Sequence, residues 1–439
     1  MILALIIFLA TYVLMLTFQK ARPWIALGSA ALFIVLGLFG VYDFSLLSAL
    51  SAVDYNVLLM IGGTMGTVTL FIESKMPARL SEMLISKVSN VKWAVTILSL
   101  FAGVISAFVD NVATVLMVAP IGLAISKKLK ISPVPVLIAI AVSSNLQGAA
   151  TLVGDTTSIL LGSYAGMNFL DFFWMNGRPG IFWGVELGAL ASLLALFFLF
   201  RKDTQPISAK VETEVTDLFP SYLMIGTVLL LIIASFIPEP QGAVLSTIYD
   251  LRSGLICLAL CIIGIIRHCV KSKSTTILRK VIEDLDKDTL LLLFGLFIVI
   301  EGIKIAGVID AVADMFYRFS GDNPFLLYTL ITVASVIFSA FIDNIPYVAT
   351  MLPVVSSIAL LMNGGAGVEP YVFYFGLLTG ATLGGNLTPI GASANIAAIG
   401  ILRKNGETVK LSDFLRIGIP FTLLAVLAGY IFIWITWGV

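Results

Sequence analysis

The chain has 439 residues, of which 59% are hydrophobic and 12% charged, and its formal net charge is zero. Its mean hydropathy is +1.05. A soluble domain of this length would expose many more charges, so lipid must be the solvent for most of this surface. The zero net charge removes any argument for a nucleic-acid partner. We therefore expect an all-α polytopic membrane protein in contact with the lipid bilayer.

The apolar runs that could cross a membrane begin at residues 1–18. This first run lacks a basic leader and a small-residue cleavage site, so we interpret it as a retained span rather than a signal peptide. A bilayer core about 30 Å thick requires roughly 20 apolar residues per helix. The ordinary span candidates, in chain order, are 1–18, 24–41, 56–72, 181–200, 221–237, 254–266, 289–303 and 414–437.

Four other apolar stretches are not simple spans. Residues 133–165 and 371–402 are too long for one straight helix and are interrupted by Gly, Asn, Thr and Pro, which predicts two broken helices. Residues 93–126 and 325–362 are each split near the middle by Asp-Asn, which predicts two re-entrant hairpins. The expected fold is about ten spanning helices plus these hairpins.

The basic residues predict which loops are cytoplasmic. If the turn containing Lys20 and Arg22 is cytoplasmic, 22 of the 26 lysines and arginines fall on that side, a strong positive-inside bias. The bias fixes the sides of the loops but not the depth of the hairpin tips. Residues 202–218 are charged and rich in Pro, Ser and Thr, so we expect a cytoplasmic linker between a first repeat (1–201) and a second (219–439).

The two halves share sequence. Residues 105–121 and 338–354 are identical at 7 of 17 positions, and a second pair of segments, 148–154 and 385–391, follows in the same order. Each half contributes five spans, an odd number, so the second half should enter the membrane inverted. The flanking charges agree, because lysines border the first hairpin, whereas 321–323 and 363–365 at the second contain no lysine or arginine. Inverted repeats with broken helices are typical of secondary transporters.

The Asp-Asn pairs, at 110–111 and 343–344, allow two interpretations. Their arms could be two thin full spans with a surface turn, or re-entrant arms whose tip stops near the bilayer centre. The second is favoured, because the arms are short for a span and the interrupted helices recur at the same place in both halves. An aspartate at the midplane costs roughly 2.5–3.5 kcal/mol, so it requires a partner such as a cation or a proton. Asparagine offers an oxygen to a hard cation and an amide donor to an anion.

In the broken helices, glycine lets the backbone unwind, so that carbonyl groups can ligate cations while half-helix N-termini face anions. No arginine or lysine occurs in the four interrupted segments, so an anion there must be held by helix dipoles, amides and co-bound cations. The candidate binding residues are Asp110, Asn111, Thr151, Gly154, Asp155, Thr156, Asp343, Asn344, Gly385, Asn386, Thr388, Gly391, Ser393 and Asn395. For a coupling Na⁺ the candidates are Asp110, Asn111, Gly154, Asp343, Asn344 and Gly391.

Three cysteines (Cys257, Cys261 and Cys269) and His268 crowd one segment. A zinc site is conceivable there, but without a CxxC pair we interpret them as helix-packing residues. We expect no cofactor other than H⁺ or Na⁺ as a coupling ion.

These motifs resemble the ion-transporter superfamily. The pattern is most similar to the branch with a citrate transporter-like domain that contains arsenite permeases, NhaD-type sodium/proton antiporters and the melanosomal P protein. The resemblance covers roughly 56–200 and 289–437 and implies a scaffold with moving transport regions, elevator-type alternating access and often a homodimer. In related dicarboxylate/sodium carriers the tips contain Ser-Asn-Thr. Here 110–112 are Asp-Asn-Val and 343–345 are Asp-Asn-Ile, which disfavours dicarboxylates and favours proton or sodium coupling.

That branch often has Asp-Pro-Pro-Asn after the glycine of the first broken helix, whereas this chain has Asp-Thr-Thr-Ser at 155–158. The leading hypothesis is a cation-coupled secondary transporter of a small anion or of an oxyacid such as arsenite, in the cell inner (plasma) membrane. The alternatives are a sodium/proton antiporter using Asp110, Asp155 and Asp343, and an anion channel. An intramembrane aspartyl protease is disfavoured, because no GxGD motif is present and the acids occupy equivalent repeat positions. No nucleotide-binding motif occurs, so ATP-driven transport would require a separate ATPase subunit.

Overall fold

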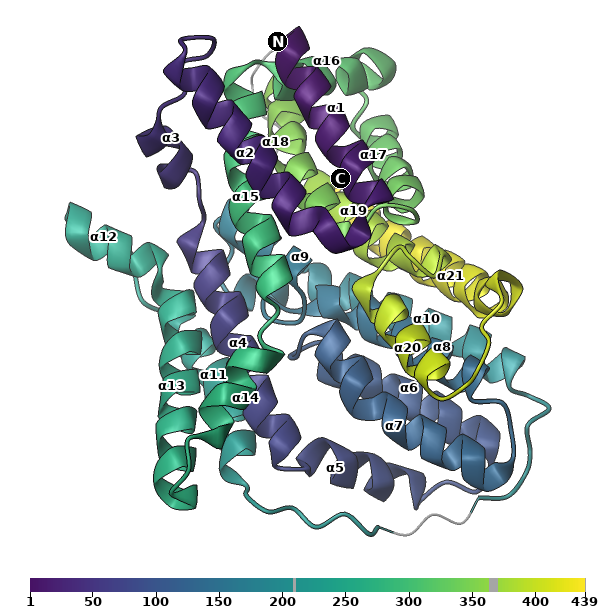
Figure 1. The fold of residues 1–439 in the computed structure, drawn as a ribbon. Helices are drawn as coiled ribbons and strands as arrows, with labels where there is room; N and C mark the ends of the chain where they lie inside the picture. The colour runs from purple at the N-terminus through teal and green to yellow at the C-terminus, as the bar shows by residue number, and fades with distance from the viewer. Residues whose placement is uncertain (208–210, 363–369, 439) are drawn as a thin grey trace.

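The computed structural model describes residues 1–207, 211–362 and 370–438, and in these residues the chain is almost entirely helical (Figure 1). The only strands within them, β1 (Trp174–Met175) and β2 (Arg178–Pro179), form one short antiparallel hairpin. Eight of the described helices are long and apolar enough to cross a membrane. Large apolar side chains also cover outward helix faces, as at Ile225, Leu229 and Ile233. The expectation of an all-α polytopic membrane protein is confirmed.

The first half of the chain contains helices α1 to α10. Their bounds are α1 (Ile2–Thr17), α2 (Arg22–Leu38), α3 (Leu46–Ser51), α4 (Tyr55–Glu73), α5 (Met76–Ile85), α6 (Val91–Ser106), α7 (Asn111–Leu129), α8 (Pro133–Gln147), α9 (Thr156–Tyr164) and α10 (Ile181–Leu199). Three 3₁₀ turns, η1 (Gln19–Ala21), η2 (Gly148–Ala150) and η3 (Leu170–Phe172), lie between them.

The second half contains helices α11 to α21. Their bounds are α11 (Phe219–Ser235), α12 (Ala243–Asp250), α13 (Arg252–Ser272), α14 (Thr276–Asp284), α15 (Lys287–Ile305), α16 (Val308–Ser320), α17 (Pro324–Ser339), α18 (Asn344–Leu361), α19 (Tyr371–Leu378), α20 (Ser393–Lys404) and α21 (Leu411–Trp437). A π-helical turn, η5 (Thr379–Leu383), and a 3₁₀ turn, η6 (Gly385–Leu387), separate α19 from α20.

A helix lies at every expected span, but α1 and α11 are shorter than the eight helices that could each cross a membrane, and α15 qualifies only together with α16. The hairpin arms α7 and α18, which the sequence predicts to be short for a span, are among those eight. Each of the eight ordinary candidates coincides with one helix to within a few residues, and both long apolar stretches are broken, at η2 and at η5–η6. The sequence did not predict the short helices α3, α5, α12, α14 and α16. They are too short or too polar to be recognised as spans, and α16 is turned by 71° from α15. The predicted external edge at 363–365 lies outside the described residues.

The two Asp-Asn hairpins are α6–α7 and α17–α18. All four arms begin at a capping side chain that accepts a hydrogen bond from a backbone N–H: Asn90, Asp110, Asn323 and Asp343. Such caps satisfy N–H groups that the first helical turn leaves without partners. The same capping pattern in both halves turns the chain sharply at 107–110 and at 340–343.

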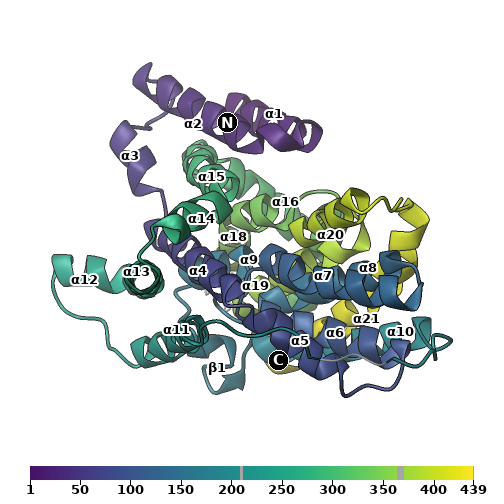
Figure 2. The same ribbon diagram turned by 60° about the horizontal axis from the view of Figure 1, so that its bottom comes forward.

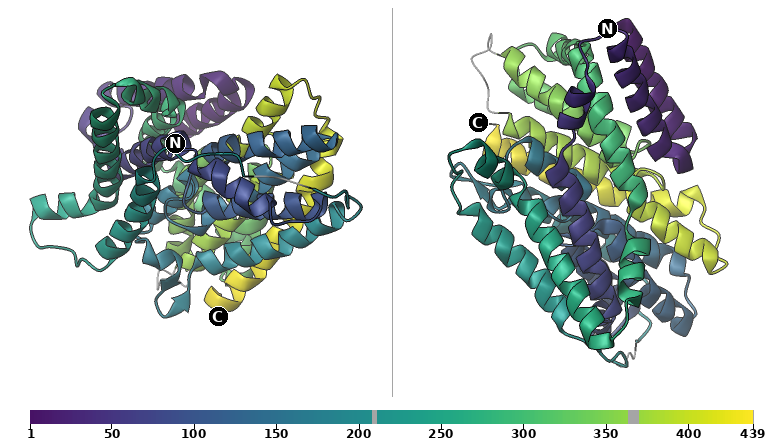
Figure 3. Two further views of the ribbon diagram at one scale, coloured as in Figure 1. Left: turned by 90° about the horizontal axis from the view of Figure 1, so that it is seen from below. Right: turned by 60° about the vertical axis from the view of Figure 1, so that its left-hand side comes forward.

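Helices of one half pack against helices of the other. Helix α13 lies along α4, and α15 lies along α2. Glycine permits both close approaches, because a Cβ on Gly63 would lie 2.4 Å from the Cys257 carbonyl carbon and a Cβ on Gly295 would lie 2.8 Å from the Ala26 carbonyl carbon. Cys257 and Cys261 are therefore packing residues of the α4–α13 contact. Figures 2 and 3 show α1 and α2 as a pair lying beside α15, at the edge of the molecule.

The hairpins and broken helices form the buried centre of the protein. Helix α8 contacts α6, α7, α10, α20 and α21, and 94% of the segment 133–150 is buried. Helices α10 and α21 pack side by side, and Trp437 Nε1, at the end of α21, donates a hydrogen bond at 2.9 Å to the Pro179 carbonyl just before α10. Helices α10 and α21 therefore run antiparallel. The broken helices lie between this pair on one side and the two hairpins on the other.

The segment that joins the two halves lies alongside the start of α6. The backbone N–H groups of Val91 and Lys92 donate to the carbonyl groups of Gln205 and Asp203 at 3.1 and 2.9 Å. The Glu82 carboxylate accepts from the Thr213 N–H at 2.9 Å. Residues 208–210 of the expected linker lie outside the described chain.

Candidate functional site

Each Asp-Asn tip begins a helix with its aspartate and buries its asparagine. Asp110 Oδ1 accepts from the N–H groups of Val112 and Ala113 at 3.0 and 3.1 Å, and Asp343 Oδ1 accepts from the Ile345 N–H at 3.2 Å. Asn111, Asp343 and Asn344 are buried, while Asp110 is partly buried. The asparagine of each tip is therefore shielded by protein, while Phe341 of the second tip is exposed, and the depth of the tips in the membrane stays a prediction.

Matching hydrogen bonds fasten each tip to the broken helix of its own half. The Thr151 hydroxyl donates to the Ala107 carbonyl, and the Thr388 hydroxyl donates to the Ala340 carbonyl. These threonines, predicted to bind a ligand, attach the helix break to the hairpin. The two sequence repeats thus make the same hydrogen bond between hairpin and helix break.

Two glycines allow the breaks to approach the tips. A Cβ on Gly154 would lie 2.5 Å from the Gly148 carbonyl oxygen and 2.8 Å from those of Ser106 and Ala107. A Cβ on Gly391 would likewise meet three carbonyl oxygens, of Gly385, Ser339 and Ala340, at 2.5, 2.6 and 3.1 Å. Three carbonyl oxygens from the tip and the break thus converge at each glycine. Hard cations prefer oxygen ligands of this kind.

Amide side chains connect the first tip to both broken helices. Asn111 Nδ2 donates to Asn145 Oδ1 at 3.1 Å. Asn145 Nδ2 donates to Asn386 Oδ1 at 3.1 Å and to the Thr382 carbonyl at 2.7 Å. Asn386 Nδ2 donates in turn to the Val142 carbonyl at 2.8 Å. All three asparagines are buried, so the chain of hydrogen bonds is shielded from solvent.

The second tip reaches the first broken helix through a carboxylate. Asp155 caps α9, since its Oδ1 accepts from the Thr156 N–H at 2.8 Å. Its Oδ2 accepts from the Thr157 hydroxyl at 2.8 Å and from Asn344 Nδ2 at 3.4 Å. In the second half Ala392 occupies the matching position, and α20 begins without a capping side chain.

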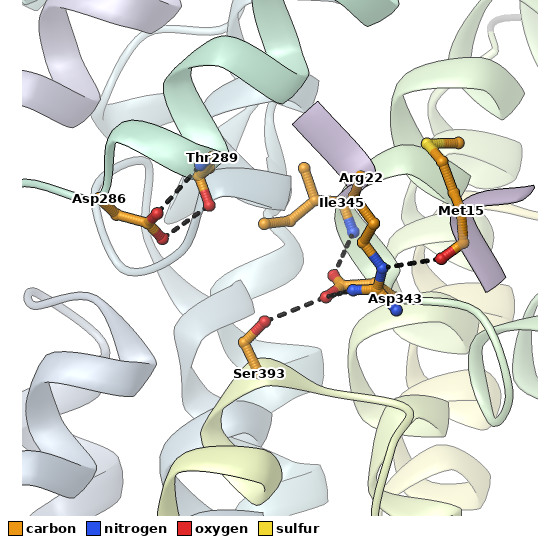
Figure 4. Close-up of polar contacts among 7 residues, drawn as sticks. All are labelled: Met15, Arg22, Asp286, Thr289, Asp343, Ile345 and Ser393. Carbon is orange, nitrogen blue, oxygen red and sulfur yellow. Dashed lines mark hydrogen bonds and ion pairs between the residues drawn. The ribbon is translucent and has the colours of Figure 1, made fainter. Parts of the chain in front are cut away.

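An arginine from outside the four predicted segments contacts the second tip. Arg22 Nη1 lies 3.1 Å from Asp343 Oδ2, which also accepts from the Ser393 hydroxyl at 3.0 Å (Figure 4). Arg22 Nε donates to the Met15 carbonyl at 3.2 Å. Among the described residues, neither Asp110 nor Asp155 has a basic partner.

The structure thus brings the predicted candidates into one region, which we call the central cluster: Asp110, Asn111, Asn145, Asp155, Thr157, Asp343, Asn344, Thr382, Asn386 and Ser393. Of the other candidates, Asn395 Nδ2 donates to the Gly385 carbonyl at 3.2 Å, and its buried Oδ1 has no hydrogen-bond partner within the described part of the chain. Thr156 supplies a backbone N–H to Asp155.

Sequence reasoning missed Arg22, Asn145 and Thr382. Asn145 had a usable signal, because an asparagine inside the apolar run of α8 is costly in a membrane unless it has a partner. Thr382 is one turn before the predicted Gly385 and had no signal of its own. Arg22 was assigned to a cytoplasmic turn, as arginines beside spans usually are. In the part of the chain that the structure describes, no group of three or more His, Cys, Asp and Glu could hold a metal ion.

Comparisons with known proteins define the class. The chain is 30% identical to an uncharacterized transporter of Mycobacterium tuberculosis over 440 residues, covering 99% of this chain and 98% of that protein. It is 25% identical to the P protein of Homo sapiens, covering 92% of this chain and 56% of that protein. The YdaH transporter of Alcanivorax borkumensis shares its fold, with a TM-score of 0.58, 15% identity, and coverage of 94% of this chain and 96% of that chain.

MtrF of Neisseria gonorrhoeae, described as illuminating a class of antimetabolite efflux pumps, shares the fold with a TM-score of 0.59 at 13% identity, over 91% of this chain and 83% of that chain. Fold and relatives together define a multi-pass membrane transporter. The citrate transporter family matches residues 12–373 and 243–438, and the chain belongs to that family. The expected resemblance to the ion-transporter superfamily is thereby confirmed.

Proposed function

We propose that this transporter is a secondary active carrier that couples the movement of a small anion or oxyacid to H⁺ or Na⁺. The observation that carries the proposal is the charge of the central cluster. Asp110, Asp155 and Asp343 bring three carboxylates into one enclosed region, and Arg22 supplies one guanidinium. An uncompensated carboxylate in a membrane protein is costly, so the remaining acids call for a proton or a bound cation.

The first tip suits a coupling cation. Asp110 has no basic partner among the described residues, and carbonyl oxygens of Ser106, Ala107 and Gly148 converge at Gly154, where the first tip meets its helix break. Carboxylate and carbonyl oxygens are the ligands that hard cations prefer. A proton on Asp110 would neutralise the same charge, so the arrangement supports either coupling ion.

The second broken helix suits an anion. Helix α20 begins without a capping side chain, so backbone N–H groups of its first turn remain available at a positive helix end. A negatively charged cargo beside a bound cation would lower the net charge of the cluster in transit. We extend the proposal to elevator-type alternating access by a homodimer in the inner (plasma) membrane, as the superfamily resemblance implies.

A sodium/proton antiporter is the second candidate. It is favoured by the excess of carboxylates over guanidinium groups, since Na⁺ and H⁺ could compete for Asp110 and Asp155 without any anion. An anion channel would use the same helix end but would neither saturate nor concentrate its cargo.

Purified protein in proteoliposomes tests the proposal. Imposed Na⁺ and pH gradients should each be assayed for their ability to concentrate arsenite, chloride or a carboxylate inside the vesicles. Asp110→Asn should abolish the gradient-driven component. Sodium-driven proton movement without any anion would favour the antiporter, and downhill flux that ignores both gradients would rule out coupled transport.

A further inference from the structure

The two Asp-Asn tips are nearly identical in sequence but differ in their electrostatic surroundings. Asp343 forms an ion pair with Arg22, whereas Asp110, among the residues that the structure describes, accepts only from the backbone N–H groups of its own helix. Figure 4 shows the guanidinium placed against the Asp343 carboxylate, on the side opposite Ser393. The position that a coupling cation would need at the second tip is therefore already taken by a cation of the protein itself.

The Arg22–Asp343 pair is enclosed. The side chain of Arg22 is 13% exposed and that of Asp343 is 6% exposed. The second contact of Arg22, from Nε to the Met15 carbonyl, fixes the direction of the guanidinium. Helix α1 adds a further attachment, because the Tyr12 hydroxyl contacts the Pro346 carbonyl at 2.7 Å and the Thr350 hydroxyl at 2.5 Å. Helices α1 and α2 are thus held against the first turns of α18.

Two other charged groups near the tips do not cancel the difference in charge between Asp110 and the Arg22–Asp343 pair. Asp155 accepts a hydrogen bond from Asn344 of the second tip, and it is acidic. Asp286, which caps α15 by accepting from the Thr289 N–H at 3.0 Å, is also acidic. Both of these carboxylates add negative charge, so the first tip has more need of an external cation than the second.

We propose that Arg22 is a built-in counter-cation for the second tip, so that the coupling ion binds on the Asp110 and Asp155 side alone. This inference rests on the proposed cation coupling and departs from the sequence expectation that both tips bind a cation. The physical reason is that arginine stays protonated at every accessible pH. Asp343 beside it does not need to exchange a proton or Na⁺, and the two tips become unequal partners in transport.

A purely structural role for Arg22 is the competing explanation. In that case its loss would weaken the attachment of α1 and α2 but leave the number of bound cations unchanged. Thermal stability alone cannot separate the two roles, so the decisive readout is how stability depends on cation concentration.

The test measures the thermal stability of the purified protein in detergent. In one series NaCl is varied while choline chloride keeps the ionic strength constant, and in a parallel series the pH is varied. The slope of the stabilisation free energy, in units of RT, against the natural logarithm of ion concentration gives the number of bound ions. This slope should rise from about one in the wild type to about two in Arg22→Gln. In that variant Asp343 is left without its partner and takes up an ion. Arg22→Gln/Asp343→Asn should return the slope to about one, because it removes both charges. Arg22→Lys, which retains the charge, should also keep the lower slope.

Arg252→Gln is the matched control. Arg252 is the first residue of α13, as Arg22 is of α2, but it donates to the Tyr249 carbonyl at 2.8 Å and stacks on that ring. Its removal should leave the slope unaltered. An unchanged slope in Arg22→Gln would overturn the inference. If Arg22→Gln does not fold, Asp343→Asn decides instead. Loss of one bound ion in Asp343→Asn would also overturn the inference. Absence of any Na⁺ or pH dependence in the wild type would instead refute the proposed coupling.

Discussion

Asn145 Nδ2 donates a hydrogen bond to Asn386 Oδ1 at 3.1 Å, across 241 residues of sequence. This contact joins the broken helix of one half directly to that of the other. Since Asn111 at the first tip donates to Asn145, the tip and both breaks form one continuous network. We infer that these parts move as one body during transport, because separating them would leave buried amide groups without partners.

The network predicts that Asn145→Asp destabilises the protein. The change removes the amide donor that faces the Thr382 carbonyl and Asn386 Oδ1 and puts a carboxylate oxygen against two acceptors. Leaving buried polar groups unsatisfied costs about 1–3 kcal/mol each. We expect a lower melting temperature in detergent and loss of flux in proteoliposomes. Ser143→Ala is the control, since the buried Ser143 hydroxyl has no hydrogen-bond partner among the described residues and its removal should be tolerated. Wild-type melting of Asn145→Asp would show that the network is dispensable.

A second prediction concerns the glycines at the two helix breaks. In Gly154→Ala and Gly391→Ala the new methyl group would lie 2.5 Å from a backbone carbonyl oxygen, too close for a carbon atom. The break would have to move away from the tip, so both variants should fold less stably and lose transport. Gly400→Ala, in α20, is the comparison, because a Cβ there meets nothing within 4 Å. Equal transport by Gly154→Ala and Gly400→Ala would rule out a close tip-to-break contact in the working protein.

The helices at the expected spans, both helix breaks and both Asp-Asn turns could be predicted from sequence, because each depends on a local signal. Apolar runs of sufficient length form helices wherever lipid is the solvent, and Asp110 and Asp343 cap the helices that follow them. The central cluster was predicted only in part. Asn111 and Asn386 belong to repeated motifs, whereas Asn145 acquires its role only when α8 packs against η5 and η6.

Arg22 illustrates the limit of the sequence. Its position beside Lys20, between two apolar runs, is typical of a residue at the membrane surface. Its partner is 321 residues away, and only the packing of α1 and α2 onto the rest of the protein brings the two together. Amphipathic helices such as α5 and α16 were missed for a related reason, since their apolar faces are defined by the neighbours they cover.

A third prediction concerns the contact between Asp217, in the segment that precedes α11, and Arg267. Asp217 accepts from Arg267 Nη1 at 2.5 Å, and this hydrogen bond holds the pKa of the carboxyl below its ordinary value of 3.8. A lowered pKa in the folded state means that the interaction stabilises the protein above that value and is lost as the pH falls through the folded-state pKa. Asp217→Asn should therefore lower the melting temperature at neutral pH.

The difference in melting temperature between Asp217→Asn and the wild type should shrink as the pH is lowered below 3.8, the ordinary value of the group. Asp314→Asn provides the control, because its pair with Arg318 is exposed and such pairs contribute little. A difference independent of pH would mean that Asp217 stabilises the protein by packing rather than by its charge.

The last prediction tests the orientation of the two halves of the chain in the membrane. Cysteines introduced as Lys128→Cys, Glu239→Cys and Gly364→Cys, in a chain whose three native cysteines are replaced, can be exposed to a membrane-impermeant maleimide on intact cells. Lys128 lies near the lysine-bordered entrance of the first hairpin, so its cysteine should react only after permeabilisation. Glu239 is exposed between α11 and α12, on the side predicted to be external, and its cysteine should react at once. Gly364, outside the described residues, borders the second hairpin without lysine or arginine and should behave like Glu239. Labelling of Lys128→Cys and Gly364→Cys from the same side would mean that the two hairpins enter from one face, and the inverted arrangement of the two halves would then be wrong.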